Sequence, residues 1–277
     1  SVKDIADSYN FLRIDTTLLE HQALFESSLG ATSDVVEKQM FSIKTRGDDV
    51  FVLRPEGTAS IARAYIEHGL SSISQPLKLY YVGPMFRYEQ PQAGRFRQFY
   101  QAGFEIVGGD GDAVYDAQII LACYRFLESL KISTGGGSSE GGRGLIVKLN
   151  TIGCRNCRPV YRKKLIEYYK ARVDNTTREK LLCGDCKRRL ATNPLRLLDC
   201  KNDKCQEFKK DAPVFFNGLC AYCKAHFKGV LEYIEELKIP YIVDNNLVRG
   251  LDYYSRTVFE IFLENPGWIL FYPINSY

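Results

Sequence analysis

The sequence lacks the features that mark several large protein classes. No stretch approaches the roughly 20 consecutive apolar residues of a membrane-spanning helix, and residues 1–10 are polar, unlike a secretory signal. No phosphate-binding P-loop or dinucleotide fingerprint is present, because the glycines of 135–144 precede an apolar run instead of joining a strand to a helix. The net charge is only +4, which is compatible with a nucleic-acid partner but does not by itself indicate one. We therefore expect a cytoplasmic protein without a membrane span.

The composition is that of an ordinary globular protein. The chain has 277 residues, of which 45% are hydrophobic and 25% charged, enough for one large or two moderate domains. Strand-like segments dominate 12–110, with the first expected over 12–19, and they follow one another through short connections. Helices are expected at 59–68 and, from the spacing of its apolar residues, at 115–130. This order favours an α+β fold, an antiparallel sheet with helices packed on it, over a doubly wound fold.

Cysteine is abundant, and eight of the nine cysteines fall in pairs. The pairs are Cys154/Cys157, Cys183/Cys186, Cys200/Cys205 and Cys220/Cys223. Two thiolates in one tight turn can bind the same zinc ion, and two such pairs complete a closed tetrahedral site. The pattern predicts two structural zinc ions, but the spacing does not say which pairs share an ion. The alternatives are one zinc ion with spare thiols, a redox pair, or cysteines without a ligand.

An arginine-rich hairpin is expected over 80–108. Arg87, Arg95 and Arg97 lie on or beside its loop, which contains a proline and a glycine and cannot continue a central strand. The alternation of a strand places four residues of the return strand on one face: Phe99, Gln101, Gly103 and Glu105. Arginine binds phosphate and carboxylate through two parallel hydrogen bonds. The hairpin therefore predicts a site for an anionic small molecule or an RNA end, with a solvated basic hairpin as the alternative.

Four stretches resemble those of the histidyl-tRNA synthetases, a family of class II aminoacyl-tRNA synthetases, in their bacterial form. The sequence LRPEGT at 53–58 resembles the loop that holds the substrate amino group, and 86–99 resembles the second class-defining motif. The sequence LVRGLDYY at 247–254 resembles the histidine-specific stretch, and 193–199 resembles part of the insertion domain. The resemblance covers 2–262 and has its motifs in the family's order.

The resemblance implies a histidine–tRNA ligase. Such an enzyme condenses L-histidine and ATP to histidyl-adenylate and transfers the histidyl group to tRNA(His), with Mg²⁺ bridging the ATP phosphates. It also implies a homodimer with a class II antiparallel sheet. The catalytic domain would comprise 1–150 and 237–277, interrupted by a mostly helical zinc-binding insertion domain over 151–236.

The resemblance assigns roles to individual residues. Arg87 and Arg249 are the implied catalytic cations, which would neutralise the repulsion between the carboxylate and the α-phosphate. The implied histidine-binding residues are Glu56, Gly57, Thr58, Arg87, Gln101, Glu105, Arg249, Tyr253 and Tyr254. The implied ATP-binding residues are Arg87, Glu89, Arg95 and Arg97. Whether Arg95 and Arg97 contact outer phosphates or the tRNA end stays open. A carboxylate that accepts an imidazole N–H would select histidine over a plain aromatic side chain.

The sequence departs from the family pattern in three ways. Thr17 stands where the first motif has a proline, and its backbone N–H can donate where proline cannot, which leaves the fit of the implied dimer open. No stretch resembles the third motif or the anticodon-binding domain, and 264–277 matches neither. We therefore expect a C-terminally truncated chain with impaired activity.

Two other functional hypotheses are alternatives to the ligase. One is a catalytically inactive, synthetase-like regulatory subunit of histidine biosynthesis, against which stand the intact Glu56, Arg87 and Arg249. The other is an independent zinc-knuckle module that binds RNA. Its candidate RNA-binding residues are Lys187, Arg188, Arg189, Lys209 and Lys210. Contacts of this kind weaken as the salt concentration rises.

Overall fold

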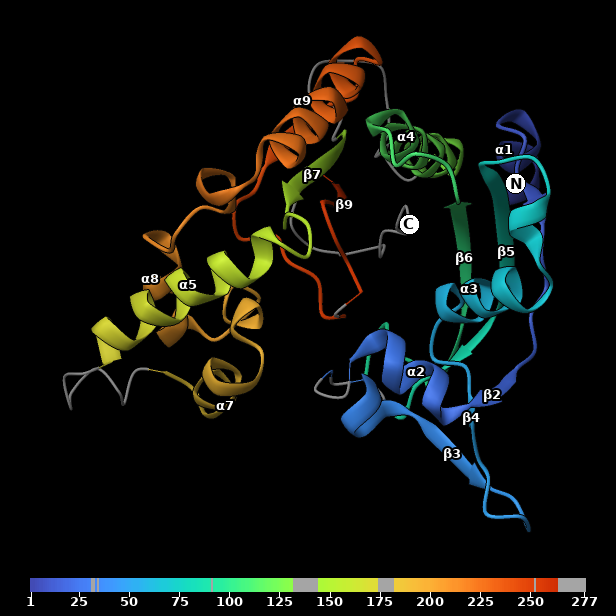
Figure 1. Ribbon diagram of the computed structural model, residues 1–277, viewed down its shortest axis with the longest axis horizontal. Coiled ribbons are helices and arrows are strands. Elements are labelled where there is room, and N and C mark those ends of the chain that lie inside the picture. The colour runs from blue at the N-terminus through green and yellow to red at the C-terminus, as the bar shows by residue number, and fades with distance from the viewer. Residues whose placement is uncertain are drawn as a thin grey trace. The chain divides into compact units, whose positions relative to one another are not determined.

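The computed structural model describes residues 1–30, 33, 35–90, 92–131, 144–173, 182–251 and 253–263. Within these residues the chain forms two compact units, which are described separately (Figure 1). Unit 1 contains 1–145 together with Leu251 and Tyr253, and unit 2 contains 146–250 and continues from Tyr254. The Gly/Ser-rich stretch 133–144, except its last residue, and the tail 264–277 lie outside the described residues.

The first sheet of unit 1 is built on a long hairpin. Strands β5 (Leu77–Phe86) and β6 (Gln98–Val107) pair antiparallel over their whole length, with Leu77 opposite Val107. The short strand β1 (Leu12–Arg13) pairs with β5 in parallel. The predicted antiparallel pairing is therefore confirmed for the hairpin, whereas β1 departs from it.

The second sheet of unit 1 has the order β2–β4–β3 and is antiparallel throughout. Its strands are β2 (Leu19–His21), β4 (Val50–Leu53) and β3 (Phe41–Lys44). The prediction of one strand over 12–19 is wrong, because this stretch divides into β1 and β2 on different sheets. Between them the carbonyl of Thr16 accepts a hydrogen bond from the Arg54 side chain instead of a strand neighbour.

The helices of unit 1 pack on its two sheets and on one another. They are α1 (Val2–Ser8), α2 (Gln22–Leu29), α3 (Thr58–Glu67) and α4 (Ala113–Ser129), with short helical turns at Val35–Gln39 and Leu70–Ser72. The two helices predicted at 59–68 and 115–130 are confirmed to within two residues. Asp112 caps α4, since its side chain accepts a hydrogen bond from the Val114 N–H.

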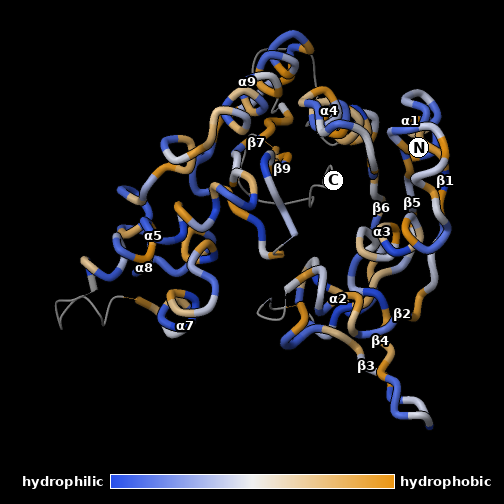
Figure 2. The backbone as a smooth tube through the Cα atoms, in the orientation of Figure 1, coloured by the Kyte–Doolittle hydropathy of each residue, from blue (hydrophilic) through white to orange (hydrophobic). Residues whose placement is uncertain are grey.

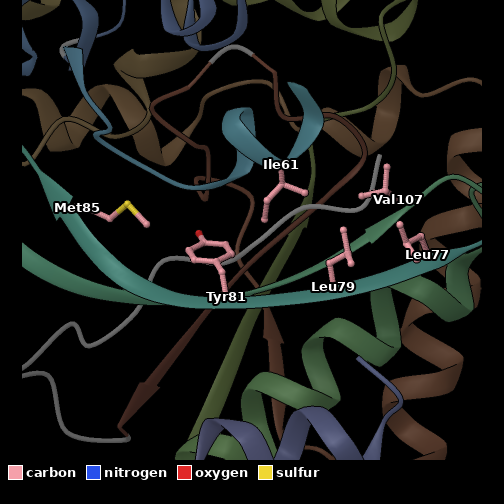
Figure 3. Close-up of a cluster of buried hydrophobic side chains, with 6 residues drawn as sticks. All are labelled: Ile61, Leu77, Leu79, Tyr81, Met85 and Val107. Atoms are coloured by element: carbon pink, nitrogen blue, oxygen red, sulfur yellow. The ribbon is translucent and has the colours of Figure 1, made fainter. Parts of the chain in front are cut away.

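Alternate residues of β5 form a core with α3. A strand directs every second side chain to one face, and in β5 the odd-numbered residues face α3. Figure 3 shows the buried members of this cluster: Ile61, Leu77, Leu79, Tyr81, Met85 and Val107. The cluster holds α3 firmly against the strand from which the arginine loop departs.

Unit 2 combines a small sheet with helices. Strand β7 (Leu145–Thr151) lies between β8 (Tyr241–Val243) and β9 (Thr257–Leu263), and it pairs with β8 in parallel. Between β7 and β8 the chain is mostly helical: α5 (Cys157–Val173), α7 (Gly184–Thr192), α8 (Asp203–Lys210) and α9 (Ala221–Glu236), with short turns at Pro194–Leu197 and Phe215–Gly218. Figure 2 shows hydrophilic and hydrophobic residues interleaved along these helices. Among the described residues, no helix has the length and apolarity needed to cross a membrane.

Candidate functional site

Three buried polar residues of unit 1 meet at the start of α3. The carboxylate of Glu56 accepts hydrogen bonds from the backbone N–H groups of Thr58 and Ala59, both at 2.8 Å. The hydroxyl of Thr58 donates to Oε1 of Glu105, on β6, at 2.7 Å. Glu56 thereby satisfies the free N–H groups at the helix start, and Thr58 links the two carboxyl groups.

The two carboxyl groups are held in an environment that opposes their charge. Burial raises the pKa of Glu105 well above its ordinary value, and the neighbouring Glu56 charge adds to this, while the Thr58 hydrogen bond acts against it. Burial also raises the pKa of Glu56, which its backbone hydrogen bonds and the Arg87 charge oppose. Within the described part of the chain, Oε2 of Glu105 is buried without a hydrogen-bond partner. A ligand N–H could satisfy that oxygen.

A tyrosine that the sequence reasoning missed lies beside these carboxyl groups. The ring of Tyr81 occupies the space next to Gly57 and Gly103, so that a Cβ atom at either glycine would overlap it. Gly103 is also the residue directly opposite Tyr81 in the hairpin. The sequence does contain one sign of this packing, because the expected hairpin pairs a tyrosine, Tyr81, with a glycine, Gly103, on the neighbouring strand. The structure thus shows a steric reason for the glycine at 57, which the sequence had suggested only as a ligand contact.

Gln101 belongs to the same face of β6 as Glu105. Its side-chain oxygen is buried and has no hydrogen-bond partner among the described residues. Buried polar atoms are nearly always paired in folded proteins. The two unpaired acceptors, from Gln101 and Glu105, therefore make this face a candidate binding surface for a ligand with N–H donors.

The three arginines of the hairpin separate into two groups. Arg87 reaches back toward α3: its Nε donates to the carbonyl of Pro55 at 3.0 Å, and its guanidinium lies 5.2 Å from the ring centre of Phe99. Arg95 instead lies 3.6 Å from the Glu89 carboxylate, and Arg97 stacks on an exposed tyrosine of the loop. Only Arg87 is brought close to the carboxyl groups by the contacts of unit 1.

The residues from the histidine-specific stretch are divided between the units. Tyr253 belongs to unit 1 and packs against a buried cluster that includes Phe25 and Leu29. Arg249 and Tyr254 belong to unit 2, where the guanidinium of Arg249 forms an ion pair with Glu260 and lies 5.5 Å from the Tyr254 ring centre. The structure therefore brings Arg249 and Tyr254 together, and separately groups Tyr253 with the core of unit 1.

The eight paired cysteines form two groups of four in unit 2. The first cysteine cluster is Cys154, Cys157, Cys220 and Cys223, and the second is Cys183, Cys186, Cys200 and Cys205. In each cluster the sulfur atoms lie within 4.8 Å of one another, and all eight cysteines are free thiols. The pairing that the spacing left open is thus resolved. Four thiols at this separation match the donor set of a tetrahedral zinc site.

Comparison with known proteins agrees with this geometry. A family model described as histidyl-tRNA synthetase matches residues 1–135. A histidine–tRNA ligase of Desulforamulus reducens is 44% identical over 265 residues, which are 96% of this chain and 59% of that protein. One from Geobacter metallireducens is 45% identical over 253 residues, covering 91% of this chain and 57% of that protein. The chain is thus similar to histidyl-tRNA synthetases over 96% of its length.

Solved structures of the histidyl-tRNA synthetase family show the same fold. The apo histidyl-tRNA synthetase of Staphylococcus aureus matches with a TM-score of 0.68 and 32% identity, covering 96% of this chain and 57% of that one. A Bacillus halodurans protein titled as an ATP phosphoribosyltransferase regulatory subunit/histidyl-tRNA synthetase matches with a TM-score of 0.61 at 23% identity, covering 96% and 68%, which supports the fold alone. The chain spans 59% of the length of the first ligase named above.

Proposed function

We propose that this chain is the part of a histidine–tRNA ligase that activates L-histidine with ATP and transfers the histidyl group to tRNA(His). The observation that carries the proposal is the buried group of Glu56, Thr58 and Glu105, which has an unpaired carboxyl oxygen. Such an oxygen fits the N–H of an imidazole. The names and the 44% identity of the relatives support the same activity.

The histidine site is proposed on the hairpin and the start of α3. Glu56, with Gly57 and Thr58 beside it, would bind the substrate ammonium group, while Glu105 would accept the imidazole N–H and Gln101 would line the pocket. A site with buried acceptors rejects side chains that leave those acceptors unpaired. Tyr253 and Tyr254 would complete the recognition of the ring.

The chemistry requires two anions to approach each other. Arg87 would bind the substrate carboxylate and the α-phosphate, and Arg249 would supply a second fixed cation. Positioned cations stabilise the charge that develops during such a reaction. Glu89, Arg95 and Arg97 would bind ATP, whose phosphates Mg²⁺ would bridge.

The proposed organisation places a zinc-binding insertion, 151–236, within a catalytic domain formed by 1–150 and 237–277. One Zn²⁺ ion would bind each cysteine cluster, and a closed site of four thiolates leaves no coordination position for catalysis. The insertion would contact the tRNA acceptor arm through its basic residues: Lys187, Arg188, Arg189, Lys209 and Lys210. The working protein would be a cytoplasmic homodimer.

Histidine-dependent ATP–pyrophosphate exchange tests the activity in the complete natural protein that carries this chain. We expect exchange with histidine and none with phenylalanine. Exchange should be lost in Arg87→Ala with the fold retained. Histidine binding without exchange would overturn the ligase and favour the regulatory-subunit alternative.

A further inference from the structure

The segment 254–256 is attached to the first half of the first cysteine cluster. Arg158, which follows Cys157 in the chain, donates from Nη1 to the carbonyl of Tyr254 at 2.9 Å. Two backbone hydrogen bonds join Arg256 to the residues just before Cys154. The N–H of Arg256 donates to the carbonyl of Gly153 at 3.0 Å, and the carbonyl of Arg256 accepts from the N–H of Ile152 at 2.8 Å. Both ends of the segment are thus hydrogen-bonded to the turn that holds Cys154 and Cys157, called the knuckle below.

The second half of the cluster contacts the same segment. Tyr222 lies between Cys220 and Cys223 in the sequence, and the guanidinium of Arg256 lies 4.7 Å from the centre of its ring. The two halves are themselves joined, because the Cys220 N–H donates to the sulfur of Cys157 at 3.2 Å. One metal ion bound by both halves would therefore clamp the segment from two sides.

The turn that holds Cys154 and Cys157 packs closely against the residue before it. A Cβ atom at Gly153 would lie 2.7 Å from Cβ of Cys157 and 2.9 Å from a methyl carbon of Leu219. The knuckle is thus in direct contact with the backbone at the end of β7, which is hydrogen-bonded to Arg256. A displacement of the knuckle would be transmitted to 254–256.

Arg256 has a backbone conformation that needs such support. Its φ angle is +57°, in the left-handed region that residues other than glycine rarely adopt. This conformation persists where surrounding contacts hold it. The two hydrogen bonds with 152–153 and the contact with Tyr222 are such contacts.

The clamped segment lies next to a proposed catalytic cation. The ring of Tyr254 is 5.5 Å from the guanidinium of Arg249, and Arg249 pairs with Glu260 on β9, the strand that begins directly after Arg256. The position of 254–256 therefore determines where the Tyr254 ring lies beside Arg249. It also determines where β9 begins, the strand that carries the Glu260 counter-ion of Arg249.

We propose that a metal ion in the first cysteine cluster, acting through Arg158 and Tyr222 as positioning residues, holds Arg249 and Tyr254 in the geometry for binding histidine. The inference rests on the proposed function, because it takes the roles of Arg249 and Tyr254 from it. It assigns the first cluster a task beyond folding: the ion fixes a substrate-binding segment that it does not touch.

The test uses two matched pairs of variants in the complete natural protein. Arg158→Met removes the donor to Tyr254, and Arg158→Lys keeps one; Tyr222→Leu removes the ring beneath Arg256, and Tyr222→Phe keeps it. We expect the Met and Leu variants to raise the histidine Kd and KM about tenfold, equivalent to about 1.4 kcal/mol. They should retain the KM for ATP, the melting temperature and the full zinc content, and the Lys and Phe controls should behave as wild type.

The ion itself is tested by Cys220→Ser, which removes the exposed ligand of the first cluster. We expect this variant to lose one zinc ion and to bind histidine about tenfold more weakly. Unchanged histidine affinity in Cys220→Ser after loss of zinc, or in both Arg158→Met and Tyr222→Leu, would overturn the inference. Calorimetric histidine binding separates the two proposals, because a wild type that binds histidine without exchange refutes the ligase yet still allows the variants to be compared. A wild type that does not bind histidine refutes both.

Discussion

The guanidinium of Arg54 fills the space that a side chain at Gly83 would need. From there it donates to the Pro84 carbonyl at 3.1 Å and to both the carbonyl and the hydroxyl of Thr16 at 2.9 Å. One buried arginine thus joins the stretch between β1 and β2 to the centre of β5. It also brings the strand ahead of the 55–58 loop into register with the hairpin, because the Phe86 N–H donates to the Arg54 carbonyl at 3.0 Å.

Gly83→Ala should therefore destabilise the protein by about 1–3 kcal/mol, the usual cost of overpacking a filled site. The added methyl group would displace the Arg54 guanidinium and break its hydrogen bonds. Urea unfolding measures the change in free energy. Gly47→Ala is the control, because the nearest atoms to its Cβ lie at 3.9 Å, and equal losses in the two variants would refute the steric explanation.

Thr58→Val should also lower stability, by about 1–3 kcal/mol, because it leaves the buried Glu105 Oε1 without its hydrogen bond. Thr58→Ser keeps a hydroxyl group and should recover most of this loss. Under the proposed function the Val variant also binds histidine more weakly. Thermal unfolding and calorimetric titration check both effects, and equal melting temperatures for Val and Ser would show that the hydroxyl contributes little.

The stability difference between Glu105→Gln and wild type should depend on pH. Because burial raises the pKa of Glu105 in the folded protein, the unfolded chain loses this proton at a lower pH than the folded protein does. The contribution of Glu105 to the free energy of unfolding is therefore fully present below the ordinary glutamate pKa. It is lost as the pH rises from that value through the raised pKa of the folded protein. Glutamine does not titrate, so the variant should gain stability relative to wild type across that window. Melting temperatures measured from pH 4 upward in small steps would show this trend, and a constant difference would contradict the raised pKa.

Zinc content should reveal the two clusters as separate sites. Cys157→Ser in the first cluster and Cys186→Ser in the second should each reduce the zinc content from about two ions per chain to about one, since four thiolates bind one ion. Cys123→Ser is the control, because burial raises the pKa of that thiol to about 12 and it lies outside both clusters. Elemental analysis provides the measurement. Loss of both ions in either variant would show that the two clusters do not bind zinc independently.

Local patterns predicted one helix and one face of the site correctly. The spacing of apolar residues marked α4, and the alternation of β6 correctly placed Gln101 and Glu105 on one face. The stretch 12–19 was misread because its apolar residues suit a strand, whereas the contacts that divide it come from Arg54, nearly forty residues away in the chain. Tyr81 was missed since its importance arises from two glycines on other segments.

The sequence by itself determined which residues are candidates for binding and catalysis. Short cysteine spacings, clustered arginines and the order of the motifs can all be read along the chain. Tertiary structure alone decided how the four cysteine pairs combine, because the halves of the first cluster are joined across 63 positions. It also decided the direction in which the pKa of Glu105 shifts, since burial, and not the residue type, raises that pKa. Burial and long-range pairing depend on packing between distant segments, and no local pattern encodes them.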